Sequence, residues 1–248
     1  MKLPGLLLAL ALTGTAHAQA TAPSATDTLL LNPRRSVDGQ LIRPFSARYT
    51  MLMRQAGQEK PVGSVATSYE YLSRPGQELA LKRSVISFPT GVIVDSGTVD
   101  RRTLYPQAHR SHQPNGRTLA LDFAGARVTG FNQVGTQRTA VDLTTPAALF
   151  DSFSADLVVQ ALPLRAGQAF KFAQYVYEKG GQDWVQGRII GARTLPSPDG
   201  RTSQPAWVVQ TFGKDQSTVT YWLDASTRRL LQVEFVQAGR ELIMRQAE

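Results

Sequence analysis

Apolar and polar residues alternate with a period of two along most of the chain from residue 45 onwards. In residues 45–54, Phe45, Tyr49, Met51 and Met53 share one face, while mostly polar residues occupy the other. Successive side chains of a strand point to opposite faces, so this pattern is typical of a strand with one buried and one solvated face. The same reasoning predicts strands over residues 65–72, 79–88, 91–99, 118–123, 127–133, 169–178, 184–192, 206–212, 218–223, 230–237 and 241–245.

Short turn signals separate these segments. Asn115-Gly116 and Ala124-Gly125 flank the strand predicted at residues 118–123 and indicate tight turns. A weak repeat relates residues 99–104 to residues 223–228, because each has an aspartate at a strand end and a threonine three residues later. An aspartate can accept backbone N–H bonds across a tight turn. We therefore expect both copies to close hairpins and to have a structural role.

Residues 146–162 break the alternation and predict a helix. Thr144-Thr145-Pro146 offers a hydroxyl cap and a proline suited to a first helical position. The apolar residues that follow recur at helical spacing until Pro163, with aspartates and a serine between them. One amphipathic helix among about twelve strands predicts a mainly β fold. Its form is a curved antiparallel sheet, or half-open β barrel, wrapped around a central helix.

The first residues resemble an export signal. Lys2 precedes a short leucine-rich stretch, and Ala16-His17-Ala18 supplies the small residues that a signal peptidase requires. The expected organisation is a signal peptide at 1–18, a flexible leader at 19–44 and a single β-rich domain at 45–248. Within that domain, two similar halves are joined by helix 146–162. The mature protein is expected to be periplasmic or secreted.

Composition narrows the classes of function. The chain has no cysteine, which excludes disulfides, thiol nucleophiles, zinc–thiolate sites and an acylated N-terminal cysteine. Removal of the signal takes away one of 27 basic residues and leaves 26 against 19 acids, a charge of +7. No basic run exceeds two residues and no nucleic-acid motif accompanies the charge, so nucleic-acid binding is not predicted. No segment after the signal is long and apolar enough for a transmembrane helix.

Catalytic signatures are absent from the sequence. His109 and His112 lie in a polar stretch flanked by Pro106, Pro114 and Gly116, which indicates a solvated loop and not a metal site. No Gly-x-Ser-x-Gly motif, phosphate-binding loop or dinucleotide fingerprint occurs. We therefore predict no enzyme activity, catalytic residue, metal or cofactor. A catalytic set assembled from distant positions stays open, because such sets are recognised by geometry and not by order.

Large apolar side chains suggest one candidate binding site. In a closed sandwich they would form core, whereas in a curved sheet the same face can line an apolar ligand cavity. Methionines beside tyrosines suit an adaptable lining. The candidate lining residues are Tyr49, Met51, Met53, Tyr69, Tyr71, Phe170 and Phe172.

Several motifs of the C-terminal half resemble a known family. They are the run Asp-Leu-Val-Val-Gln-Ala-Leu-Pro-Leu-Arg-Ala-Gly at 156–167, Ala-Trp-Val-Val at 206–209 and Thr-Tyr-Trp-Leu-Asp at 220–224. Their order resembles a family of exported bacterial proteins known only as a domain of unknown function, over residues 95–240. That family is similar in fold to the LolA/LppX lipoprotein carriers, in which a curved sheet holds helices over a hydrophobic concavity. The resemblance implies binding of a lipid or lipidated protein and supplies no catalytic residue.

Three functional hypotheses follow from the sequence. The first is a non-enzymatic extracytoplasmic protein that binds a lipid or another amphiphile in an apolar concavity. The second is a structural or assembly protein of the cell envelope, which acts through a protein partner and fills the concavity with its own helix. The third is an extracytoplasmic hydrolase. The sequence predicts no oligomeric state.

Overall fold

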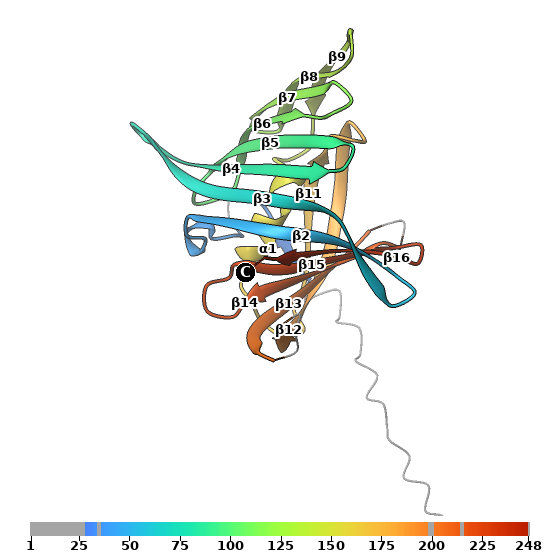
Figure 1. The fold of residues 1–248 in the computed structure, drawn as a ribbon. Coiled ribbons are helices and arrows are strands. Elements are labelled where there is room, and N and C mark those ends of the chain that lie inside the picture. The colour runs from blue at the N-terminus through green and yellow to red at the C-terminus, as the bar shows by residue number, and fades with distance from the viewer. Residues whose placement is uncertain (1–27, 34–35, 198–200, 214–215, 248) are drawn as a thin grey trace, which may run out of the picture.

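A single sheet contains every strand that the computed structural model describes, over residues 28–33, 36–197, 201–213 and 216–247 (Figure 1). The predicted signal peptide lies outside these residues. The strands are β1 (Thr28–Leu31), β2 (Phe45–Gln55), β3 (Gln58–Arg74), β4 (Gln77–Phe88), β5 (Gly91–Asp100), β6 (Pro106–His112), β7 (Arg117–Ala124), β8 (Arg127–Val134), β9 (Gln137–Thr144), β10 (Phe150–Asp151), β11 (Ala169–Val176), β12 (Gly181–Pro196), β13 (Ser203–Phe212), β14 (Thr218–Asp224), β15 (Leu230–Gln237) and β16 (Arg240–Gln246).

The sheet is curved and open. Its order is β1-β11-β12-β13-β14-β15-β16-β2-β3-β4-β5-β6-β7-β8-β9. The short strand β10 pairs with the last part of β11, after the residues of β11 that pair with β1. β1 and β10 run parallel to β11, whereas all other pairs are antiparallel. Side chains of β7 and β8 meet those of β11 in an apolar cluster that includes Leu121, Val128 and Tyr175. The barrel-like shape is therefore drawn together by packing, without a ladder of hydrogen bonds between its edges.

All twelve predicted strands are present, with ends that differ by several residues in β3 and β12. The tight turns at Asn115-Gly116 and Ala124-Gly125 are confirmed as the connections between β6, β7 and β8. The sequence did not predict β1, β6, β9 and β10. β9 has mostly exposed residues, and β6 is rich in polar ones, so neither shows a clear apolar face.

The predicted helix at 146–162 is much shorter in the structure. Residues 146–149 are irregular, β10 and a 3₁₀ turn, η3 (Ser152–Ser154), follow, and only α1 (Ala155–Gln160) is α-helical. Phe150 and Asp151 are extended because they pair with Gln174 and Tyr175 of β11. The Asp151 side chain then accepts the Phe153 N–H at 3.3 Å, which starts the helical segment later than predicted.

Of the predicted flexible leader, residues 19–44, the structure describes residues 28–33 and 36–44, and both described parts contain residues that pack into the fold. β1 adds to the sheet through β11, and Leu31 is buried. A 3₁₀ turn, η2 (Gly39–Leu41), follows, and Ile42 after it is also buried. These two side chains fill the core beside α1, and apolar burial of that kind fixes a segment that otherwise looks irregular.

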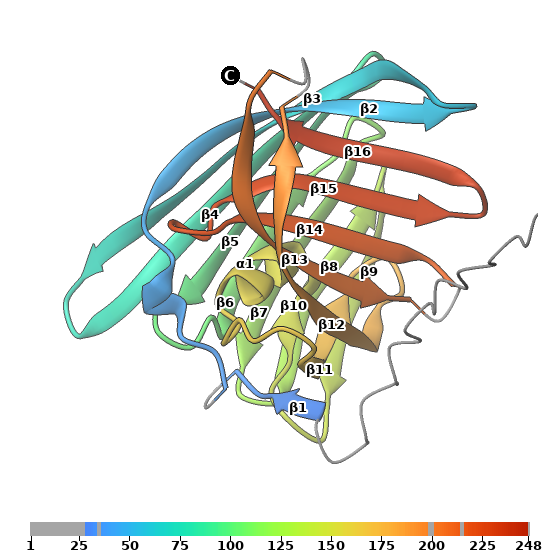
Figure 2. The ribbon, with the colours of Figure 1, turned by 90° about the horizontal axis from the view of Figure 1, so that it is seen from below.

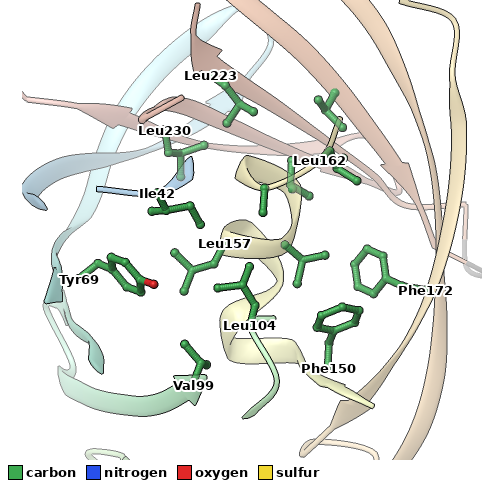
Figure 3. Close-up of a cluster of buried hydrophobic side chains, with 14 of the residues drawn as sticks. Ile42, Tyr69, Val99, Leu104, Phe150, Leu157, Leu162, Phe172, Leu223 and Leu230 are labelled. Atoms are coloured by element: carbon green, nitrogen blue, oxygen red, sulfur yellow. The ribbon is translucent and has the colours of Figure 1, made fainter. Parts of the chain in front are cut away.

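The main core lies on the concave face of the sheet, where α1 sits (Figure 2). Leu157, Val158 and Leu162 from the α1 segment are fully buried. Around them lie side chains from strands that are far apart in the sheet order, among them Tyr69 of β3, Phe172 of β11 and Leu223 of β14 (Figure 3). None of the helices in the described part of the chain has the length and apolar character needed to cross a bilayer.

Candidate functional site

Five of the seven candidate lining residues belong to the core around α1. Tyr49, Met51, Tyr69, Phe170 and Phe172 are between 0 and 7 % exposed. Phe172 packs edge-on against Phe150, with ring centroids 5.5 Å apart, at the start of the segment that leads into α1. The concavity that these side chains were expected to line is thus occupied by the chain's own helix. Their role in ligand binding stays a prediction.

The other two candidates lie nearer the ends of their strands. Met53 is half-buried near the end of β2. Tyr71 is 37 % exposed, donates its hydroxyl to the Ile42 carbonyl at 2.8 Å, and lies beneath the Arg101 guanidinium at 4.3 Å from its ring centroid. These contacts attach the segment after η2 to the sheet, so Tyr71 has a structural task in this arrangement.

A polar cluster lies under the start of the α1 segment, on the concave face of β4, β5 and β6. Cross-strand register aligns Lys82 with Gly97 and Gly97 with His109. A Cβ atom at Gly97 would lie 2.9 Å from Cδ1 of Phe153, so only glycine leaves room for this ring. The Phe153 ring stacks on His109, with centroids 4.9 Å apart, and Lys82 Nζ lies 4.5 Å from its centroid. We call Lys82, Asp95, His109, Asp151 and Asp156 the buried polar cluster.

His109 is the centre of this cluster and is fully buried. Its Nδ1 lies 3.2 Å from Asp151 Oδ2, and its Nε2 lies 3.9 Å from Asp95 Oδ1. Neither contact has the alignment of a hydrogen bond. Burial by itself would lower the pKa of the imidazole, but the charges of Asp151 and Asp95 outweigh it and raise the pKa to about 9. His109 is therefore a buried cation at neutral pH.

Lys82 supplies the second buried cation and holds the helical segment. Its Nζ donates to the Phe153 carbonyl at 2.7 Å and to Asp156 Oδ1 at 2.5 Å. Asp156 lies in the first turn of α1, where a carboxylate also interacts favourably with the helix N-terminus. This ammonium group thus fixes η3 and α1 to β4.

The cluster has the chemistry of an anchor more than that of a catalyst. Both His109 nitrogens face carboxylates, which leaves neither free to activate a serine as in a Ser–His–Asp arrangement. Ser111 and Ser154 are buried nearby, and their hydroxyls make no hydrogen bond with other described residues. Within the described ranges, no group of three or more histidine and acidic side chains has the geometry to hold a metal ion.

The prediction of a solvated loop for His109 and His112 is wrong. Both residues lie in β6, where His109 points into the fold and His112 is exposed. The prolines and glycine that suggested a loop are at the ends of this strand. One usable signal was present, because His109 and Ser111 are two residues apart and so share a face. The acidic partners of His109, Asp95 and Asp151, are too distant in sequence to be recognised.

One of the solved structures similar to this chain supports its fold. The chain is similar to the crystal structure of a β-barrel-like protein of the domain of unknown function DUF1849 from Brucella abortus. The TM-score is 0.51 and the identity 8 %, over 86 % of this chain and 98 % of that one. A DUF1329 family protein from Desulfovibrio piger ATCC 29098 aligns with a TM-score of 0.28 and 9 % identity, over 84 % of this chain and 86 % of that one.

No curated protein matches the chain. The sequence pattern of one family, described as "Protein of unknown function (DUF3108)", matches residues 77–240. That match covers more than half of the chain and includes both Asp-x-x-Thr turns and the α1 segment. The predicted resemblance to a β-rich family of unknown function is thereby confirmed, and the chain belongs to the DUF3108 family.

Proposed function

We propose that this chain is a non-enzymatic binding protein that works outside the cytoplasm and acts on a protein partner of the cell envelope. One observation carries this proposal, which is that α1 occupies the concave face. Leu157, Val158 and Leu162 take the place that a bound amphiphile would need. The barrel-like fold then presents its outer face and its two strand edges, β1 and β9, to other molecules.

The buried polar cluster supports a binding role over a hydrolytic one. His109 is inaccessible to solvent, and carboxylates flank both of its nitrogens. A general base must reach the proton that it removes, within hydrogen-bond distance or through one water. A role in holding η3 and α1 against the sheet accounts for the same contacts without a substrate.

The test uses the full chain, expressed with its own N-terminus in an export-competent host. A photo-crosslinking residue is placed at Phe212 or at Val236, which are 45 % and 41 % exposed, and at buried Val209 as the matched control. We expect a mature mass that begins at residue 19 and a discrete protein adduct from the two exposed positions only. Retention of residues 1–18, or equal adducts from Val209, would contradict the proposal.

A second candidate is lipid binding in the concavity, with the α1 segment displaced. Three buried hydroxyl groups near its start lack hydrogen bonds with other described residues: Ser111 Oγ, Ser152 Oγ and Ser154 Oγ. Buried groups without partners are costly, which reduces the free energy needed to lift the segment away.

Native mass spectrometry and hydrogen exchange separate the two candidates. Lipid binding predicts extra mass that extracts into organic solvent, together with faster amide exchange over residues 155–162 when lipid is added. The envelope-partner proposal predicts an unchanged mass and unchanged exchange after incubation with mixed lipids. The first result would support lipid binding, and the second would support the envelope-partner proposal.

A further inference from the structure

The outer face of β2, β3 and β4 contains an open hollow of about 560 Å³. Side chains that bound it include Ser46, Arg48, Ala66, Ser68, Arg83 and Val85. These residues alternate with Tyr49, Val65 and Tyr69, which belong to the core on the concave side. The hollow therefore faces away from α1 and from the buried polar cluster.

Strand register explains how the hollow is made. Arg48 of β2 pairs with Ala66 of β3, and Arg83 of β4 pairs with Ser68 of β3. The central strand thus contributes only small side chains, while each flanking strand contributes an arginine. Spacings of about 4.8 Å between strands and about 3.4 Å per residue place the two arginine Cα atoms roughly 12 Å apart. Two long guanidinium side chains can close on one phosphate across that floor.

Neither arginine is engaged within the protein. Among the described residues, the Arg48 and Arg83 side chains make no ion pair or hydrogen bond, and both residues are exposed. Four other arginines near the surface do have carboxylate partners: Arg54 with Glu59 and Glu241, Arg110 with Asp122, Arg127 with Asp142 and Arg245 with Glu59. Arg48 and Arg83 are thus two neighbouring cations available to an external anion.

An exposed apolar patch continues from the hollow. Val85 pairs across the strands with Val94, and Val92 lies two residues further along β5 on the same face. Their exposed fractions are 39, 44 and 45 %. The three valines are contiguous, and contiguous exposed apolar groups mark interaction sites. We call Arg48, Arg83, Val85, Val92 and Val94 the arginine–valine face.

We propose that the arginine–valine face docks on the surface of an anionic phospholipid bilayer. Arg48 and Arg83 bind headgroup phosphates, and the three valines rest against the boundary between headgroups and acyl chains. Charge complementarity selects this partner, because two unpaired cations adjoin the valines on a chain of formal net charge +8. The docking is peripheral and reversible, and it does not depend on the protein partner proposed above.

The test measures co-sedimentation of residues 19–248 with phosphatidylcholine vesicles, with or without phosphatidylglycerol. We expect binding only to the anionic vesicles, weakened by salt. Arg48→Gln and Arg83→Gln should each lower the partition coefficient about fivefold, as expected for the loss of one basic residue near a charged membrane. Val94→Ser, as a separate single variant, should lower the partition coefficient more than either arginine variant and should not change its salt dependence.

The matched control is Arg127→Gln, which removes one exposed positive charge from β8, outside the arginine–valine face. It should leave the partition coefficient within about twofold of the unchanged protein. If Arg127→Gln lowered the partition coefficient as much as the other two arginine variants, net charge alone would explain the effect and the proposal would be overturned. Equal binding to neutral and anionic vesicles would also overturn it. Binding of glycerol phosphate to Arg48 and Arg83 without vesicle binding would assign the hollow to a free phosphate and also overturn the membrane proposal. Unchanged melting temperatures verify that each variant is folded.

Discussion

Two hairpins in this chain, β5–β6 and β14–β15, are closed by the same turn. In the first, Asp100 Oδ1 accepts the backbone N–H groups of Arg102 and Thr103, at 3.1 and 2.8 Å, and the Thr103 hydroxyl at 2.7 Å. In the second, Asp224 Oδ1 accepts the N–H groups of Ser226 and Thr227, at 3.0 and 2.6 Å, and the Thr227 hydroxyl at 2.8 Å. The weak sequence repeat therefore encodes a repeated backbone structure.

The turns differ at the residue that follows the threonine. Leu104 and Arg228 both adopt left-handed backbone conformations, with φ of 56° and 61°, which are uncommon for residues other than glycine. Leu104 is fully buried in the core beside α1 (Figure 3). Arg228 instead donates to the carbonyls of Gln160 and Leu162, at 3.2 and 2.7 Å, at the end of α1. Both strained residues thus direct a side chain to the α1 segment, one by apolar packing and the other by hydrogen bonds.

The inner faces of the two hairpins diverge in the same way. β5 and β6 place Asp95 and His109 toward the helical segment, whereas β14 and β15 place Tyr221 and Val233 there. One backbone design therefore supports an ionic contact in one hairpin and an apolar contact in the other. The comparison indicates that the turns conserve geometry, while the chemistry that faces α1 is set separately in each hairpin.

The largest expected effect separates the two strained residues. Leu104→Ala should lower the free energy of unfolding by about 3 to 4 kcal/mol, because it leaves a cavity in a core that cannot collapse freely. Arg228→Ala should cost about 1 to 2 kcal/mol, since water can replace part of the two hydrogen bonds. Urea unfolding followed by circular dichroism measures both values. Equal losses of unfolding free energy would contradict the view that the two turns differ in the strength of their side-chain contact with the α1 segment.

The second expected effect concerns the ionic inner face of β5–β6. The pKa of His109 is raised from 6.5 to about 9, so the folded protein binds a proton that the unfolded chain releases. The resulting stability is fully present below about pH 6.5 and is lost as the pH rises through about 9, by an amount on the order of 3 kcal/mol. Unfolding free energies measured from about pH 6 to about pH 10 test this predicted loss of stability. His109→Gln is the control, and it should lack the decline in this range.

The sequence predicted the sheet well because burial on one face imposes a period of two. Residues such as Tyr49 and Met51 alternate with less buried neighbours, and this alternation indicates a strand. The predicted Asp-x-x-Thr hairpins are confirmed because the side-chain contacts that form such a turn are local in sequence. The helix was predicted too long because β10 pairs with β11, a tertiary contact that propensity does not reveal.

The buried polar cluster could not be predicted for a related reason. His109 is surrounded by polar residues and two nearby prolines, which favour a loop when only neighbours are considered. Its burial depends on Asp95 from β5, Asp151 from β10 and the Phe153 ring above Gly97. The hollow between Arg48 and Arg83 has a similar origin, since strand register alone brings these side chains together over β3.

The smallest expected effect tests whether the two turns are equivalent. Asp100→Ala and Asp224→Ala should each lower the free energy of unfolding by about 1 to 2 kcal/mol, because each removes a carboxylate that accepts several hydrogen bonds, three at Asp100 and four at Asp224. Their effects should add within about 0.5 kcal/mol in the double variant, as is usual for sites without shared partners. A difference above about 0.5 kcal/mol between the losses of the two single variants would contradict the equivalence of the turns. Acid titration tests the turn at Asp224, since hydrogen bonds from Ser226 and Thr227 outweigh burial and lower the pKa of Asp224. The stability that Asp224 contributes is therefore present at neutral pH and is lost as the pH falls through that lowered pKa, a decline that Asp224→Ala should remove.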